Sequence, residues 1–249
     1  MRQISKLFFW VPNFITAMNL AAGSAAVFLG IQGYIGWAAL CIALASVFDF
    51  MDGMAARLLR SYSEIGKQLD SLADLVSFGL APAAMLITML QLAMFGEVRP
   101  LLNIDANWMQ WCFLFSALLV PIAGAFRLAK FNLDTRQSEN FLGLPIPANA
   151  LFYASLAVVV DWGTSNFFNQ IILNRFNLLT AVAIISALMI SEVPMFSLKF
   201  KNLKWKGNQI RLLFLLLCVV LFATLNIYGL PLIIISYIVI SLFTRILQK

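Results

Sequence analysis

Long apolar stretches, separated by short polar or Gly- and Pro-containing breaks, dominate the chain from residue 12 to residue 246. One long run, from Leu212 to Thr244, contains no charged residue at all. Apolar stretches of about 20 residues are typical of helices that span a membrane. The pattern predicts an all-α integral membrane protein with about eight transmembrane helices, near residues 12–32, 35–58, 70–95, 109–130, 146–162, 177–197, 212–228 and 230–246.

Composition and patterning exclude two other protein classes. Apolar residues make up 62% of the chain and charged residues 11%, against about 45–50% and about 25% in soluble domains. Strands of a membrane β-barrel alternate apolar and polar residues, whereas these stretches are continuously apolar. Because no internal repeat or Pro/Gly/Ser-rich linker divides the chain, we expect one transmembrane domain over residues 1–249.

The distribution of Lys and Arg indicates how the helices are oriented. If the N-terminus is inside, fifteen of the seventeen basic residues lie in inner segments, and only Arg99 and Arg175 lie outside. This bias follows the positive-inside rule and predicts cytoplasmic N- and C-termini in a bacterial-type inner membrane. Anionic lipid at the cytoplasmic face then explains the net charge of +6, with no nucleic-acid partner.

Residues 1–11 are predicted to form a short amphipathic segment on the membrane surface. The segment combines basic and aromatic side chains, Arg2, Lys6, Phe8, Phe9 and Trp10. A signal peptide is the alternative, with small residues for cleavage in the stretch AAGSAA at 21–26. That alternative is weakened by three polar residues that interrupt the following apolar stretch, Asn13, Thr16 and Asn19.

Histidine is absent from the chain, and its three cysteines, Cys41, Cys112 and Cys218, fall far apart inside predicted helices. The absence of histidine excludes Ser-His catalysis, histidine metal ligation and a phosphohistidine intermediate. The cysteines show no metal-ligand spacing, so we expect them to fill apolar space.

Four aspartates lie at the ends of the second and third predicted helices, in otherwise apolar surroundings. Asp49 and Asp52 are three residues apart, and Asp70 and Asp74 are four apart, so each pair shares one helix face. The connection LLRSYSEIGKQ is short, which makes the two helices antiparallel neighbours. We therefore expect the two carboxylate faces to point at one another.

Carboxylates within apolar membrane helices are costly and usually functional. The alternative is that charged residues in this region are ordinary solvated residues of a loop, and we accept this explanation for Glu64 and Lys67. Four carboxylates around one space repel each other unless cations lie between them. With no histidine or thiolate nearby, Mg²⁺ or Mn²⁺ fits best and Ca²⁺ less well. The predicted cofactor is two such ions, suited to bind phosphate oxygens and held by Asp49, Asp52, Asp70 and Asp74.

The aspartates belong to a longer pattern, D-x₂-D-G-x₂-A-R-x₈-G-x₃-D-x₃-D, which runs from Asp49 to Asp74. It resembles the signature of the CDP-alcohol phosphotransferases, integral membrane enzymes that make phospholipids. The resemblance implies that Asp49, Asp52 and Asp70 hold two metal ions against the diphosphate of a CDP-linked donor. It also implies that Asp74 is the base that activates the acceptor hydroxyl, with metal ligation as a second role.

Small and basic residues of the same pattern are predicted to contact CDP-diacylglycerol. Gly53 and Ala56 lie on or beside the face that carries the first two aspartates, where a bulky side chain would block a ligand. Arg57 is placed to pair with a phosphate. Gly66 either lets the backbone turn sharply or is only a loop glycine. The first helix carries a polar stripe of three residues spaced by three, Asn13, Thr16 and Asn19. This stripe contacts the nucleotide, with Asn13 and Thr16 as the candidates, or only hydrogen-bonds to neighbouring helices.

Three further stretches resemble the bacterial phosphatidylserine synthases of this family, LDSLADLVSFGLAPA at 69–83, FRLAKFN at 126–132 and GLPIPANA at 143–150. The resemblance implies transfer of the phosphatidyl group from CDP-diacylglycerol to L-serine, with direct attack of the serine hydroxyl and release of CMP. The same resemblance implies a homodimer. The active site is expected to face the cytoplasm.

A serine pocket needs partners for a carboxylate and an ammonium group. The candidates for the carboxylate are Arg127, Lys130 and Asn132, although positive-inside anchoring is an alternative for the two basic residues. Glu192 is expected deep in an apolar helix, where it meets the serine ammonium or pairs with a basic neighbour.

Two alternatives to serine transfer remain open. A phosphatidylglycerophosphate or phosphatidylinositol-phosphate synthase would use the same chemistry, but its phosphorylated acceptor would need a denser Arg/Lys pocket. A cation-coupled transporter would place carboxylates near mid-membrane, often in paired halves of the chain. Here the carboxylates cluster near one face, with no second cluster in the other half, which favours an enzyme.

Overall fold

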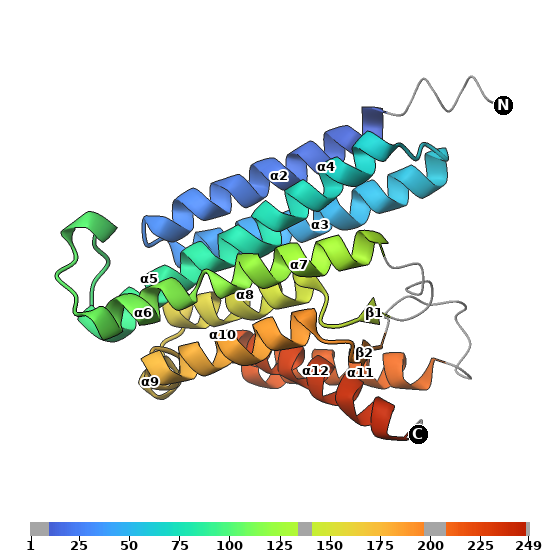
Figure 1. The fold of residues 1–249 in the computed structure, drawn as a ribbon. Helices are drawn as coiled ribbons and strands as arrows, with labels where there is room; N and C mark the ends of the chain where they lie inside the picture. The colour runs from blue at the N-terminus through green and yellow to red at the C-terminus, as the bar shows by residue number, and fades with distance from the viewer. Residues whose placement is uncertain (1–9, 134–140, 197–207, 248–249) are drawn as a thin grey trace.

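The computed structural model describes residues 10–133, 141–196 and 208–247, which form a bundle of helices (Figure 1). The predicted all-α fold is confirmed over these residues, apart from one antiparallel pair of two-residue strands that was not predicted, β1 (Phe141–Leu142) and β2 (Pro194–Met195). Of the predicted surface segment 1–11, all but the last two residues lie outside the described residues.

The N-terminal part of the bundle carries the aspartate pattern. Its elements are α2 (Trp10–Ile31), α3 (Ile35–Leu59), α4 (Glu64–Asp74), the π-helix η1 (Leu75–Leu80) and α5 (Ala81–Phe95). The last three follow one another without a break as a 32-residue helical stretch. α4 runs back in the direction opposite to α3 (Figure 1), and α2 packs against both. The predicted antiparallel arrangement is therefore confirmed, with α2 as a third partner.

The rest of the bundle consists of the helices that follow residue 100. They are η2 (Leu101–Asn103), α6 (Trp108–Ser116), α7 (Leu119–Leu133), α8 (Ile146–Trp162), α9 (Asn166–Ile172), α10 (Arg175–Ile190), α11 (Gln209–Leu225), η3 (Asn226–Tyr228) and α12 (Gly229–Leu247). The break between the last two long helices begins at Asn226, which adopts a positive φ of 51°. This break lies a few residues before the predicted boundary between the spans 212–228 and 230–246.

The number of membrane spans is smaller by length and composition than the eight predicted. Among the described residues, five helical stretches are long and apolar enough to cross a membrane, or six if α9 and α10, bent by 58°, form one span. α11 and α12 fall within one such stretch, and α8 has only 17 residues. At 1.5 Å per residue, α8 is about 25 Å long, shorter than a hydrocarbon core of about 30 Å. The count of eight stays a prediction.

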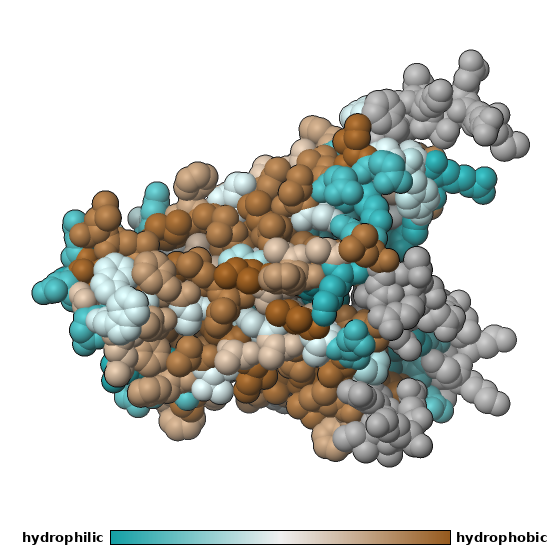
Figure 2. All heavy atoms as spheres, in the orientation of Figure 1, coloured by the Kyte–Doolittle hydropathy of each residue, from teal (hydrophilic) through white to brown (hydrophobic). Residues whose placement is uncertain are grey.

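Polar segments gather at the two ends of the bundle. The start of α2, the turn between α3 and α4, the end of α7 and the strands lie at one end, whereas α9 and the loop after α5 lie at the other (Figure 1). Hydrophobic side chains cover the broad middle of the visible surface, with hydrophilic ones toward both ends (Figure 2). This distribution is that of an integral membrane protein, and it agrees with the predicted grouping of the N-terminus, Arg57 and Lys130 at one face.

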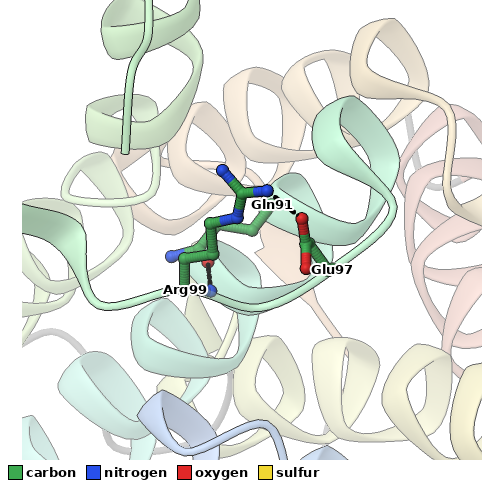
Figure 3. Close-up of polar contacts among 3 residues, drawn as sticks. All are labelled: Gln91, Glu97 and Arg99. Carbon is green, nitrogen blue, oxygen red and sulfur yellow. Dashed lines mark hydrogen bonds and ion pairs between the residues drawn. The ribbon is translucent and has the colours of Figure 1, made fainter. Parts of the chain in front are cut away.

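The loop after α5 illustrates the end remote from the aspartates. Gly96 ends the helix with a positive φ of 74°, which glycine adopts without strain. The backbone N–H of Arg99 then donates to the side chain of buried Gln91 at 2.8 Å, and its guanidinium pairs with Glu97 (Figure 3). Both charged side chains are about half exposed, 51% and 55%. Exposed pairs of this kind contribute little to stability, so this cluster serves to shape the loop.

Small residues allow the helices around the site to approach closely. Buried alanines line the contacts that α2 and α3 make with their neighbours, Ala22, Ala26, Ala38, Ala39 and Ala45. At the start of α3 the backbone N–H of Gly36 donates to the Asp161 carboxylate of α8 at 3.2 Å. A negative charge at a helix N-terminus is favourable. These contacts hold α3, and with it the first two aspartates, against α2 and α8.

Candidate active site between α2, α3 and α4

Three carboxylates converge where α3 faces α4. Asp49 comes from α3, and Asp70 and Asp74 come from successive turns of α4. One carboxylate oxygen from each lies within 4.8 Å of the other two. Asp74 is buried, and the other two are partly buried. The prediction that the two carboxylate faces point at one another is confirmed for these three residues.

The turn that brings α3 and α4 together is encoded locally. Arg60 ends α3 in the left-handed conformation, with a φ of 51°, and reverses the chain. Ser63 then caps α4, because its hydroxyl oxygen accepts a hydrogen bond from the Gly66 N–H at 3.0 Å. Neither sequence-based explanation of Gly66 is right, since this residue lies inside α4 and the sharp turn is made by Arg60.

The reason for a glycine at position 66 is instead the close approach of neighbouring side chains. A Cβ atom at this position would lie 2.8 Å from Asn13 Oδ1 and 2.9 Å from Ser63 Oγ. Both distances are too short for a carbon atom, so a larger residue here would displace the side chains of Asn13 and Ser63, whereas glycine leaves them in place. Asn13 thus contacts the aspartate pattern, at the end of the polar stripe on α2. Its predicted contact with the nucleotide stays a prediction.

Asp52 stands apart from the group of three. It is 6% exposed, and its Oδ2 accepts a hydrogen bond of 2.6 Å from the Thr16 hydroxyl of α2. The sequence predicted Asp52 as a metal ligand and Thr16 as a nucleotide contact or a helix-to-helix partner. The hydrogen bond between helices is confirmed for Thr16, whereas ligation by Asp52 stays a prediction.

Asn19 is the third residue of the polar stripe on α2, and the predicted alternative, a hydrogen bond to a neighbouring helix, is confirmed for it. It is fully buried, and its Nδ2 donates to Asp74 Oδ1 at 3.2 Å. Its backbone oxygen accepts a hydrogen bond from the Ser77 hydroxyl at 3.0 Å. The available signal was the spacing of three between the polar residues of α2, which places them on one face. What that face meets could not be known before the helices were packed.

A π-helical turn follows directly after Asp74. Pro82 has no N–H to donate to the carbonyl of Phe78 four residues earlier, and its ring disturbs a regular α-helix there. Asn149 of α8 replaces the missing donor, since its Nδ2 lies 2.9 Å from the Phe78 carbonyl oxygen. Wide turns of this kind are frequent at functional sites. The contact joins two of the stretches that resemble phosphatidylserine synthases.

The residues that follow Asp52 border open space. Gly53 and Arg57 are exposed, and Ala56 is partly buried. A Cβ atom at Gly53 would have no neighbour within 4 Å. Packing of the protein against itself therefore does not require glycine at this position. This openness leaves room for a ligand beside the carboxylates, as the predicted donor contacts need.

Arg127 is buried in α7 and bonded to backbone. Its Nε donates to the carbonyl of Leu144, and its Nη2 lies 3.5 Å from the Gly143 carbonyl oxygen. These bonds fasten the segment that leads into α8, a structural role that the sequence did not predict. The predicted contact of Arg127 with serine stays a prediction.

Lys130 and Asn132 lie near the end of α7, on the side of the bundle where α4 begins. The Lys130 ammonium donates to the Ile190 carbonyl at 3.2 Å, which holds the end of α10. The Asn132 side chain donates to Ser71 Oγ at 2.8 Å, and this serine adjoins Asp70 in α4. Asn132 thus connects α7 to the aspartate helix. Whether either residue contacts serine stays a prediction.

Glu192 does not lie where the sequence predicted it. The sequence placed it deep in an apolar helix, but α10 ends at Ile190 and Glu192 is exposed in the segment before β2. Pro194 disfavours helical conformation in the residue before it, so the helix stops earlier than hydropathy suggests.

The three converging carboxylates fit a hard divalent cation. All of their donor atoms are carboxylate oxygens, which Mg²⁺ and Mn²⁺ prefer. Asp70 Oδ1 is buried and has no hydrogen-bond partner among the described residues. A buried carboxylate oxygen without a partner is costly, and a bound cation would remove that cost. The fit is therefore good for Asp49, Asp70 and Asp74.

Comparison with known proteins agrees with this site. The family model described as CDP-alcohol phosphatidyltransferase matches residues 9–191. A CDP-diacylglycerol–serine O-phosphatidyltransferase of Bacillus subtilis is 34% identical over 151 residues, which cover 61% of this chain and 74% of the relative. One of Helicobacter pylori is 33% identical over 198 residues, covering 78% and 74%. One of Methanocaldococcus jannaschii is 30% identical over 183 residues, covering 74% and 72%. With its signature aspartates assembled between α3 and α4, the chain belongs to the CDP-alcohol phosphatidyltransferase family.

Proposed function

We propose that this chain is a CDP-diacylglycerol–serine O-phosphatidyltransferase, which transfers a phosphatidyl group from CDP-diacylglycerol to L-serine and releases CMP. The observation that carries the proposal is the convergence of Asp49, Asp70 and Asp74 within 4.8 Å of one another. The names of the relatives in three species support serine as the acceptor.

The proposed chemistry uses carboxylates in two ways. Asp49, Asp52 and Asp70 would hold two ions of Mg²⁺ or Mn²⁺, which when bound neutralise the diphosphate and stabilise the departing CMP. Asp74 takes the proton from the serine hydroxyl. The hydroxyl oxygen then bonds to the lipid-side phosphorus, as the bond from that phosphorus to the oxygen of CMP breaks. No covalent enzyme intermediate is required.

The donor is proposed to lie along the open side of α3. Gly53 and Ala56 leave space for the nucleotide and its phosphates, and the exposed guanidinium of Arg57 is free to approach a phosphate oxygen. For the serine carboxylate we propose Lys130, Asn132 and the charge of Arg127. All three lie on α7, and Asn132 reaches α4 beside Asp70 through Ser71. Gly66 supports the site by packing.

The basic residues near the site favour serine over a phosphorylated acceptor. The Arg127 guanidinium already donates to two backbone carbonyls, and the Lys130 ammonium donates to a third. A glycerol 3-phosphate or inositol phosphate group carries two negative charges and calls for several uncommitted cations. A single carboxylate with an ammonium group makes a smaller demand.

Purified protein tests the choice of acceptor directly. CMP release from CDP-diacylglycerol is measured with Mg²⁺ or Mn²⁺ and a panel of L-serine, glycerol 3-phosphate and an inositol phosphate. We expect release with L-serine, and release slowed by about 10²–10⁴-fold in the Asp74→Asn variant at comparable protein levels. Release that required glycerol 3-phosphate and ignored serine would contradict the substrate while leaving the chemistry intact.

We also propose that residues 1–249 form one domain in a bacterial-type inner membrane, with both termini and the active site in the cytoplasm. Ser63→Cys and Asn103→Cys, each made in a variant without the three natural cysteines, test this orientation. An impermeant thiol reagent added to intact cells should label the second and not the first. The reverse result would invert the topology. The homodimer implied by the resemblance has no support in the single chain and stays a prediction.

A further inference from the structure

We infer that α2 positions two of the signature aspartates, with Thr16 orienting Asp52 and Asn19 orienting Asp74. Both are positioning residues, because each acts through a carboxylate. The inference rests on the proposed function, in which Asp52 is a metal ligand and Asp74 is the base. Thr16 and Asn19 lie only one helical turn apart on one face of α2, yet each supports a different aspartate.

The contact between Thr16 and Asp52 is short and buried. Thr16 is 3% exposed and Asp52 is 6% exposed. The Thr16 hydroxyl lies 2.6 Å from Asp52 Oδ2 and 3.0 Å from the Pro12 carbonyl oxygen. The hydroxyl has one proton, and donation to the carboxylate is stronger because the acceptor carries charge. This bond restrains the Asp52 carboxylate and leaves its Oδ1 without a hydrogen bond from Thr16.

Asn19 is bonded through both its side chain and its backbone. Asn19 is fully buried and donates through Nδ2 to one oxygen of Asp74, at 3.2 Å. Its own backbone is tied to η1 by the Ser77 hydroxyl at 3.0 Å. One turn further along α2, a Cβ atom at Gly23 would lie 2.6 Å from the Ser77 backbone. α2 therefore packs directly on the turn that follows Asp74, and Asn19 has little freedom to move.

Neutral donors suit this task better than cations. A lysine or arginine beside these carboxylates would neutralise them and repel a bound metal ion. A hydroxyl and an amide orient a carboxylate without adding charge, as residues behind metal ligands generally do. Each donates to only one oxygen of its aspartate, so the second oxygen of each carboxylate is left for another partner.

The first test separates metal affinity from stability. Divalent-metal binding to purified Thr16→Val is measured by calorimetry, together with the Mg²⁺ or Mn²⁺ concentration that gives half-maximal CMP release. We expect about 10–100-fold weaker binding, with turnover restored at saturating metal, and Thr16→Ser within about threefold of the wild type, because it keeps the donor.

Thr88→Val is the matched control. Its hydroxyl is buried and donates at 2.6 Å to the Gly30 carbonyl, so it also links α2 to a neighbouring helix, α5, but far from the aspartates. This variant is expected to lower thermal stability without changing metal affinity. Unchanged metal affinity in Thr16→Val, or an equal change in the control, would overturn the role of Thr16.

The second test concerns Asn19. We expect Asn19→Leu to lower kcat by about 10–100-fold, the usual cost of losing such a supporting residue, with KM for CDP-diacylglycerol and metal affinity within about threefold of the wild type. Asn19→Asp keeps the shape but loses the donor, so its turnover should fall as well, even if the leucine variant folds poorly. Full turnover in Asn19→Asp would overturn the role of Asn19.

The failure of the proposed function would look different. A wild-type protein that bound no divalent cation would contradict the metal site itself. A wild-type protein that bound metal but used another alcohol would change only the substrate, and the metal titrations would still decide whether Thr16 positions Asp52.

Discussion

Two apolar stretches of this chain look alike in composition and differ in their surroundings. The stretch from Glu64 to Phe95, which carries Asp70 and Asp74, has 72% of its most apolar window buried inside the protein. The stretch from Gln209 to Phe243 is more apolar, yet only 6% of its window is buried, and it lies beyond the residues matched by the family model. The more apolar stretch is therefore the one exposed on the outside of the bundle, and the less apolar one forms part of the core.

The hydroxyl side chains of the two stretches also differ in where they donate their hydrogen bonds. In the buried stretch, Ser77 and Thr88 donate to backbone carbonyls of α2, so their hydroxyls join helices. In the exposed stretch, Thr224 and Ser236 donate to carbonyls of their own helix, three or four residues earlier. Lipid offers no hydrogen-bond partner, so a hydroxyl that faces it must bond within its own helix. Polar residues in the buried stretch thus carry the architecture of the site.

The largest effect is expected when a converging carboxylate loses its charge. Asp70→Asn and Asp49→Asn should each abolish transfer and weaken metal binding, because each removes an anionic ligand from the shared centre. CMP release and metal calorimetry measure both effects. Ser236→Ala in the exposed stretch is the control and should keep full activity. Full activity of both aspartate variants at ordinary metal concentrations would contradict the metal site.

The next largest effect is expected at Asp74. Asp74→Asn should still bind CDP-diacylglycerol and at least one metal ion, yet lose turnover by about 10²–10⁴-fold, the usual contribution of general-base catalysis. Calorimetric titration with CDP-diacylglycerol, alongside turnover, checks this prediction. If affinity for the donor collapsed together with turnover, Asp74 would be chiefly a ligand.

An intermediate effect, on stability, compares the two stretches directly. Met85 is fully buried in α5, and Leu216 is 60% exposed in α11. Met85→Ala leaves a cavity and should lower the free energy of unfolding by about 2–5 kcal/mol. Leu216→Ala removes contacts mainly with lipid and should cost less than about 0.5 kcal/mol. Thermal unfolding in the same detergent compares them, and equal losses would show that α11 is covered by protein.

The smallest effect on stability is expected at Gly53. Because a Cβ atom there would have no neighbour within 4 Å, Gly53→Ala should leave the melting temperature unchanged or slightly raised, since alanine favours a helix. A rise in KM for CDP-diacylglycerol with an unchanged melting temperature would separate ligand contact from packing. A marked drop in melting temperature would show instead that this position is packed.

Much about this protein follows from local features of the chain. Apolar stretches predict the helices, because the fold class depends on residue composition along a single segment. The spacing of Asp49, Asp52, Asp70 and Asp74 predicts shared helix faces, because 3.6 residues complete one turn. The short connection between α3 and α4 then makes the convergence of three carboxylates predictable. The number of membrane spans was harder to predict from the sequence, because hydropathy does not give the length or bend of a helix such as α8 or α10.

Only the tertiary structure decided which residues stand behind the aspartates. Thr16 and Asn19 are more than 30 residues away along the chain from the carboxylates that they contact, and no local pattern relates them. The same holds for Asn149 at the Phe78 carbonyl and for Arg127 at the segment before α8. Their partners depend on how α2, α7 and α8 pack around α4. That packing is a property of all the helices together, whereas the aspartate spacing is a property of two.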